Sequence, residues 1–194
     1  GIDFSGGRNY IVRFEQPVST DDVREVLSNV FVDAQTSVIT MGDNNQVRIS
    51  TNYGNESIDE NIDAQIENTL YTSLKPMMDE NVTEQMFVER YVVENGEYRA
   101  SMLDDDTTFG IQSSQKVGPT VADDIKTSAI WSILFALIAI ALYILIRFRN
   151  ISFSIGAVVG LVHDVLFILG IYSIFYSIMP FSLEIDQSFI AAIL

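Results

Sequence analysis

The stretch from Thr127 to Ile146, TSAIWSILFALIAIALYILI, contains no charged residue, and it limits the fold more than any other part of the sequence. An apolar helix of about 20 residues crosses the roughly 30 Å hydrocarbon layer of a bilayer at 1.5 Å per residue. Trp131 and Tyr143 lie near its two ends, where interfacial aromatic residues are common. A buried helix of a large soluble protein is disfavoured because a second apolar stretch follows almost at once. The sequence therefore predicts a membrane helix over residues 127–146.

The second apolar stretch, Ile151 to Met179, carries one acidic residue, Asp164. About a dozen Leu, Ile, Val and Phe residues each favour insertion by roughly 0.3–0.6 kcal/mol, whereas a central Asp opposes it by about 2.5–3.5 kcal/mol. Since the apolar sum is larger, a second membrane helix is predicted over residues 152–178. The apolar run at residues 188–194 predicts the start of a third.

Charge is divided sharply between two parts of the chain, which together have a formal net charge of -15. From Thr127 onward only five residues are charged: Arg147, Arg149, Asp164, Glu184 and Asp186. Residues 1–126 are therefore predicted to form one acidic domain, whose charge argues against binding nucleic acid or anionic lipid. Two arginines in the short connection between the helices indicate the cytoplasmic side, which places residues 1–126 outside the cell membrane. The Gly at the start and the apolar run at the end indicate cuts in a longer protein.

Within residues 1–126, hydrophobic periodicity predicts alternating strands and helices. The expected elements are a strand at 9–15, a helix capped by Ser19 or Thr20, strands at 36–41 and 46–51 around a turn at 42–45, a helix opened by a Ser57–Glu60 capping box, and a last strand at 109–117. This order is that of the ferredoxin-like split βαβ fold, so the predicted class is an α+β ferredoxin-like domain followed by transmembrane helices.

An inserted hairpin is predicted at about residues 88–106, before the last strand. Its strands, 89–93 and 98–103, flank Asn95-Gly96, which is a strong hairpin signal. The acidic tip at 104–106 is interpreted as a solvated surface loop in preference to an ion or partner site.

The second predicted membrane helix carries the residues that suggest chemistry. Gly156, Gly160 and Asp164 recur every four residues and share one face, where small residues let another helix approach; Gly170 extends this packing surface. Asp164 is a functional candidate because an intramembrane carboxylate is costly when charged and can bind a proton instead. The alternative is permanent pairing with a Lys or Arg of a neighbouring helix. His163 lies about 100° away around the helix, and both an interhelical hydrogen bond and a proton-path role stay open for it.

Enzymatic chemistry has little support. The chain has a single His and no Cys, no zinc-ligand spacing, and no phosphate-binding loop, since Gly6-Gly7 lacks the Walker lysine. An intramembrane aspartyl protease would need a second buried Asp. We therefore expect no enzyme activity, no metal site and no cofactor, with protons as the coupling ion.

Five stretches, in order, resemble the SecF family. They are GIDFSGG (Gly1, Ile2, Asp3, Phe4, Ser5, Gly6, Gly7), Val117-Gly118-Pro119, YILIRF ending in Arg147 and Phe148, LVHDV around His163 and Asp164, and FIAAIL at 189–194. Ile2 and Phe4 favour SecF, alone or as half of a fused SecDF chain, over SecD. The sequence departs from the family at Ser5, which replaces a common Thr, at 121–125, which lacks the usual Gly, and in the longer hairpin.

The resemblance implies a multi-pass protein of the bacterial inner membrane, similar to the RND superfamily, with residues 1–126 outside. It implies SecD, the Sec translocon channel, exported polypeptide and membrane lipid as partners, and no nucleic acid. It also implies that proton flow drives late steps of export, with Asp164 as a proton-path residue. Two alternatives are an RND-like transporter of small molecules or lipids, and a structural or sensory membrane protein in which Asp164 is a fixed interhelical anchor.

Overall fold

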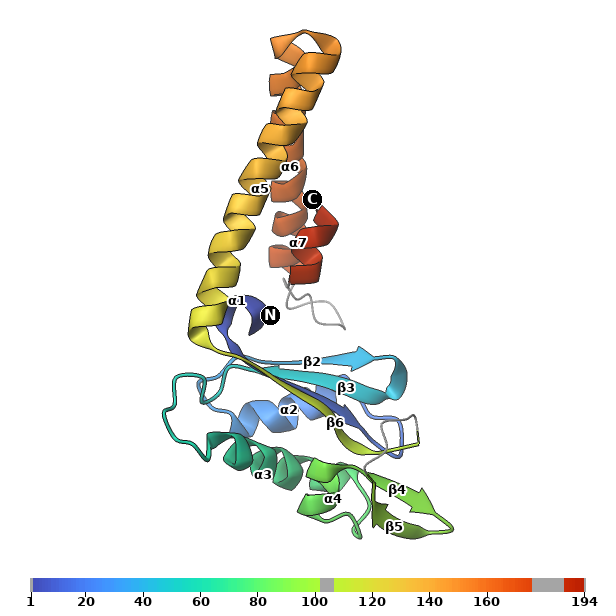
Figure 1. Cartoon of the computed structure of the whole chain (residues 1–194). Coiled ribbons are helices and arrows are strands. Elements are labelled where there is room, and N and C mark those ends of the chain that lie inside the picture. The colour runs from blue at the N-terminus through green and yellow to red at the C-terminus, as the bar shows by residue number, and fades with distance from the viewer. Residues whose placement is uncertain (1, 102–106, 176–186, 194) are drawn as a thin grey trace.

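The computed structural model describes residues 2–101, 107–175 and 187–193 (Figure 1). A mixed α+β region is followed by long apolar helices. The elements are α1 (Ile2–Ser5), β1 (Gly7–Arg13), α2 (Thr20–Val30), β2 (Thr36–Met41), β3 (Asp43–Thr51), α3 (Ile62–Leu74), η1 (Lys75–Met77), α4 (Glu84–Glu89), β4 (Tyr91–Glu94), β5 (Glu97–Ala100), β6 (Gly110–Val117), α5 (Pro119–Phe148), α6 (Ile151–Phe175) and α7 (Gln187–Ile193). The predicted tip at 104–106, the predicted helix end at 176–178, and Gly1 lie outside the described residues.

Four strands form an antiparallel sheet in the order β2-β3-β1-β6. Alternate residues of β1 point to opposite faces, so Tyr10 and Val12 are buried while Ile11 is only partly covered. Helices α2 and α3 cover one face, and the long helices rise from the other side of the sheet (Figure 1). The core therefore lies between the sheet and α2 and α3.

Two predicted features near the start of α2 and α3 have different outcomes. Ser19 caps α2, because its side chain accepts a hydrogen bond from the backbone N–H of Asp22. The predicted Ser57–Glu60 capping box is wrong: α3 begins only at Ile62, and Ser57 instead accepts from the N–H of Asp59 in the preceding loop. Apolar residues recur every four positions along α3, and this spacing predicts one buried face. Ile62, Ile66, Leu70 and Leu74 are buried accordingly, whereas Ile58, four residues before the helix, is fully exposed. The turn at 42–45 is also shorter than predicted, since β3 already begins at Asp43.

The predicted hairpin is present as the two-stranded sheet β4–β5, with Asn95 and Gly96 both at positive φ in its turn. Tyr91 joins it to the rest of the fold through a bridge to Phe109, directly before β6. The Tyr91 hydroxyl donates to Glu15 Oε1 at 2.8 Å and the Tyr98 hydroxyl to Oε2 at 3.3 Å. The hairpin is thus anchored to the loop after β1.

Helix α5 is continuous from Pro119 to Phe148, so it begins before the predicted start at Thr127. Its 30 residues extend about 45 Å, which exceeds the hydrocarbon thickness, and its first turns carry charges such as Asp123 and Lys126. Helices α5 and α6 are both long and apolar enough to cross a membrane. The predicted boundary between 126 and 127 therefore falls inside one helix.

Candidate functional site

The first candidate site is the sheet–helix junction, formed by residues 2–7 and 117–119. Gly6 and Gly7 both have positive φ, and they turn the chain from α1 into β1. A Cβ on Gly7 would lie 2.4 Å from the backbone oxygen of Thr51, and one on Gly6 would lie 2.3 Å from Asn55 Nδ2. At Gly7 a side chain would collide with the backbone at the end of β3, and at Gly6 the positive φ itself favours glycine.

The two stretches that resemble the SecF family at residues 1–7 and 117–119 meet at this junction. Gly7 pairs with Val117 across β1 and β6. Gly118 is the sole residue between β6 and α5, and Pro119 occupies the first turn of the helix, where its missing N–H costs nothing. The sheet is therefore joined to α5 without an intervening loop.

Arg8, immediately after Gly7, fixes the start of β1 and was missed by the sequence analysis. Its guanidinium is 2% exposed; it pairs with Asp63 Oδ1 in the first turn of α3 and donates to the Tyr53 carbonyl at 3.1 Å. Partial burial opposes ionisation of Asp63, but Arg8, followed by Lys116, outweighs it and holds the pKa of that carboxyl below its ordinary value. The only hint in the sequence is an arginine next to the glycine pair.

The second candidate site is the His163–Asp164 pair on α6. His163 Nδ1 lies 3.3 Å from Asp164 Oδ1, and the imidazole stacks on the Phe167 ring one turn later. The two side chains are 75% and 76% exposed in the chain alone. The structure thus brings together two residues that their angular separation did not require to meet. It leaves both facing away from α5.

The glycines of α6 have no packing partner within the described part of the chain. Among the described residues, no atom outside the local helix backbone lies within 4 Å of a Cβ built on Gly156, Gly160 or Gly170. Where α5 and α6 meet beside the Arg149–Asn150 turn, buried Ser154 donates to the Ala141 carbonyl at 2.8 Å. The helix-packing role of these glycines stays a prediction.

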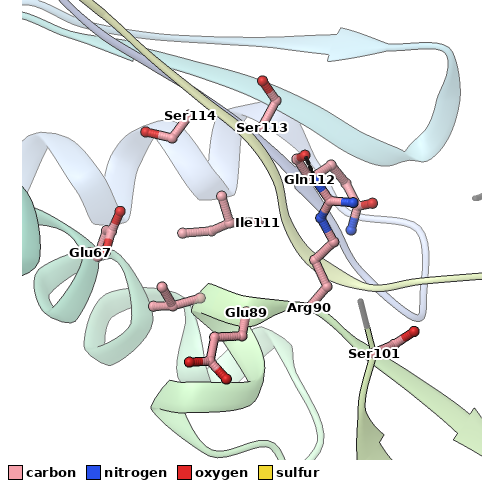
Figure 2. A pocket seen from close by; sticks show the side chains of 9 residues that line it. Glu67, Glu89, Arg90, Ser101, Ile111, Gln112, Ser113 and Ser114 are labelled. Carbon is pink, nitrogen blue, oxygen red and sulfur yellow. Dashed lines mark hydrogen bonds between the residues drawn. The ribbon is translucent and has the colours of Figure 1, made fainter. Parts of the chain in front are cut away.

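In the α+β region, a hollow of about 360 Å³ opens between β6, α3 and α4 (Figure 2). Val88 and Ile111 give it apolar walls, and polar groups line the rest: Glu67, Glu89, Arg90, Ser101, Gln112, Ser113 and Ser114. Burial and then the negative charge of Asp63 raise the pKa of Glu67. Such a surface can accept hydrogen bonds from a cationic or peptide group. Nothing in the sequence pattern indicated it.

Among residues 2–101, 107–175 and 187–193, no group of three or more His, Cys, Asp or Glu side chains is arranged to hold a metal ion.

An α+β region is joined through one residue to two helices long and apolar enough to cross a membrane, the second with a carboxylate midway along it, which is the arrangement expected of a membrane protein. Residues 98–194 match the family described as protein export membrane protein SecD/SecF, C-terminal, and residues 1–18 match the SecD/SecF GG motif. The chain belongs to the SecD/SecF family of membrane proteins.

Curated relatives are SecF subunits. The chain is 37% identical over its full length to the protein translocase subunit SecF of Rhodothermus marinus, covering 52% of that protein. It is 29% identical to SecF of Thermodesulfovibrio yellowstonii, again over its full length and covering 50% of the relative. The chain thus spans about half the length of these curated relatives.

A solved structure has a similar fold. SecDF from Thermus thermophilus, described as a translocon-associated membrane protein, matches with a TM-score of 0.59 and 21% identity. The match covers 99% of this chain and 20% of the SecDF chain. It supports the arrangement of a mixed α+β region followed by apolar helices.

Proposed function

We propose that this chain is part of an accessory subunit of the Sec translocase that uses the proton motive force to assist polypeptide export across the inner membrane. It acts without enzymatic chemistry and without a cofactor other than protons. Its partners are SecD, or the SecD half of the same chain, the translocon channel, the exported polypeptide and the surrounding lipid.

The observation that carries the proposal is the placement of Asp164. It is the one acidic residue of the 25-residue helix α6, and its carboxylate is exposed beside His163. A charged group there is costly in hydrocarbon, so it needs a polar partner or a proton. Protonation removes the charge and allows the Gly156/Gly160 face to pack closely against a neighbouring helix, whereas deprotonation separates them.

The α+β domain acts as the output arm, which means that it moves with the membrane helices and contacts the exported polypeptide. Its strand order, β2-β3-β1-β6, supports a ferredoxin-like class, and Gly118 alone separates it from α5. The arginines at the α5–α6 turn favour a cytoplasmic turn, with the output arm on the outer side. The membrane potential supplies about 2.3 kcal/mol per charge per 100 mV, so a few protons are sufficient to move such an arm.

The substitution Asp164→Asn tests the proposal, because it keeps the side-chain shape and removes the titrating group. In the complete protein with its partners, export of a reporter precursor should fall to the level seen when the proton motive force is collapsed. Normal proton-dependent export by this variant would contradict the proposal. If export per molecule is normal and only the amount of folded protein falls, Asp164 is a structural anchor instead.

Asp43→Asn provides a matched control. It makes the same chemical change at an exposed position of the β2–β3 hairpin. We expect export by this variant to equal that of the unmodified protein.

A further inference from the structure

A hydrogen bond joins the two ends of the chain at the sheet–helix junction. Asp3 Oδ2 accepts from the backbone N–H of Gln187 at 3.1 Å, across 184 positions of sequence. Asp3 belongs to α1, directly before the glycine pair, and Gln187 is the first residue of α7. The Asp3 carboxylate thus connects the α+β region to α7.

Asp3 is held in place by its own segment. Ile2 is buried, its carbonyl accepts from the N–H of Gly6 at 2.7 Å, and α1 packs against the first turns of α5, where Ala122 is buried. Gly7 then enters the sheet opposite Val117. In Figure 1, α1 lies between the sheet and the long helices, beside the lower end of α5. The Asp3 carboxylate is therefore fixed relative to both the sheet and α5.

The other side of the hydrogen bond leads to α6. Phe189, in the first turn of α7, contacts Tyr172 of α6 with ring centroids 4.6 Å apart. Tyr172 lies eight residues after Asp164, about 12 Å along the helix. A shift of α6 thus moves α7, and α7 is tied to the outer domain at Asp3.

We infer that Asp3 is a positioning residue: its hydrogen bond to Gln187 joins the entry strand of the outer sheet to α7. Movement of the helices then reaches the sheet through two points, Gly118 at the start of α5 and Asp3 at the start of α7. The consequence for export rests on the proposed function, whereas the contact itself does not.

Two substitutions of Asp3 separate hydrogen bonding from charge. Asp3→Asn keeps an acceptor oxygen and should export at close to the normal rate. Asp3→Ala removes the acceptor, and export should fall by about fivefold or more, the lower limit for coupling between distant sites. Equal export by Asp3→Ala and the unmodified protein, at equal abundance, would overturn the inference, as would an equal loss in both variants.

A covalent tie provides the decisive test: residues 1–194 contain no cysteine, and any cysteine elsewhere in the complete protein is replaced by Ser. The double variant Asp3→Cys with Gln187→Cys, in the complete protein, is treated with a short bis-methanethiosulfonate cross-linker that reductant cleaves. We expect low export before cross-linking, recovery after it and loss again on reduction. The single variant Asp3→Cys should stay low throughout.

Failure to cross-link, or low export despite cross-linking, would exclude the proposed connection between Asp3 and Gln187. Cross-linking reports on proximity independently of proton coupling. If Asp164→Asn exports normally while the double variant behaves as expected, the joint stands and the proton mechanism fails.

Discussion

At the residue scale, the sheet–helix junction depends on Gly6 and Gly7, and the residues around them in the sequence do not explain why glycine is needed there. The resemblance to the SecF family identified Gly6 and Gly7 as a motif, but not what they avoid. Thr51 and Asn55, which approach them, lie more than 40 positions away, and no periodicity predicts that contact. The same holds for Arg8 and its partner Asp63. They lie 55 positions apart, so their ion pair cannot be predicted before the fold is known.

The substitution Gly7→Ala should be strongly destabilising. The new methyl group would lie 2.4 Å from the Thr51 backbone oxygen, at φ +143°, so strand β3 would have to move. We expect a loss of about 3 kcal/mol or more in the free energy of unfolding. Gly42→Ala is the control: φ is +79° but no atom lies within 4 Å, so only the backbone cost of about 1 kcal/mol applies. Urea unfolding followed by circular dichroism measures both; equal losses would mean that the close approach is unimportant.

At the element scale, the sequence predicted strands and helices well where one face is buried. The period-four apolar residues of α3 and the Asn95-Gly96 turn are local signals, and both correspond to observed elements. The start of α3 was wrong because Ser57 and Asp59 form their own turns in the preceding loop. Helices α1 and α4 were missed because they are only 4 and 6 residues long, too short to show periodicity.

The β4–β5 hairpin provides a prediction about anchoring. Tyr91 is fully buried and its hydroxyl donates to Glu15 at 2.8 Å, whereas the Tyr98 bond to the same carboxylate is 3.3 Å long. Tyr91→Phe should cost about 1–3 kcal/mol because it removes a fully buried hydrogen bond to a charged acceptor. Tyr98→Phe should cost less because the Tyr98 side chain, which also interacts with Asp79, is only partly buried. Amide hydrogen exchange of β4 and β5 should rise in the same order. Faster exchange in Tyr98→Phe than in Tyr91→Phe would show that the other tyrosine is the anchor.

At the scale of the whole molecule, the resemblance predicted the family, whereas the boundary predicted from charge between residues 126 and 127 falls inside the continuous helix α5. The partner of the glycine face of α6 could not be predicted, and among the described residues α5 does not cover that face. A repeat of small residues indicates that another helix can approach closely, but it does not indicate which helix.

The two regions should also respond differently to alkali. Burial raises the pKa of Tyr10 from 10.0 to about 12, and burial followed by the hydrogen bond to Glu15 raises that of Tyr91 still further. The folded state then holds these protons more tightly than the unfolded state. The free energy of unfolding of the α+β region should therefore be unaffected below pH 10 and fall as the pH rises through about 12.

Helices α5 and α6 contain no buried tyrosine hydroxyl among their described residues, so the membrane region should keep its structure over the same range. In detergent, absorbance at the tyrosinate band together with circular dichroism would report unfolding of the α+β region. Fluorescence of Trp131 in α5 would report on the apolar helices. The substitution Tyr10→Phe removes one of the tyrosines with a raised pKa and should reduce the alkaline loss. If Trp131 fluorescence changes together with the tyrosinate signal, the junction transmits unfolding from the sheet into α5, and the two regions form a single cooperative unit.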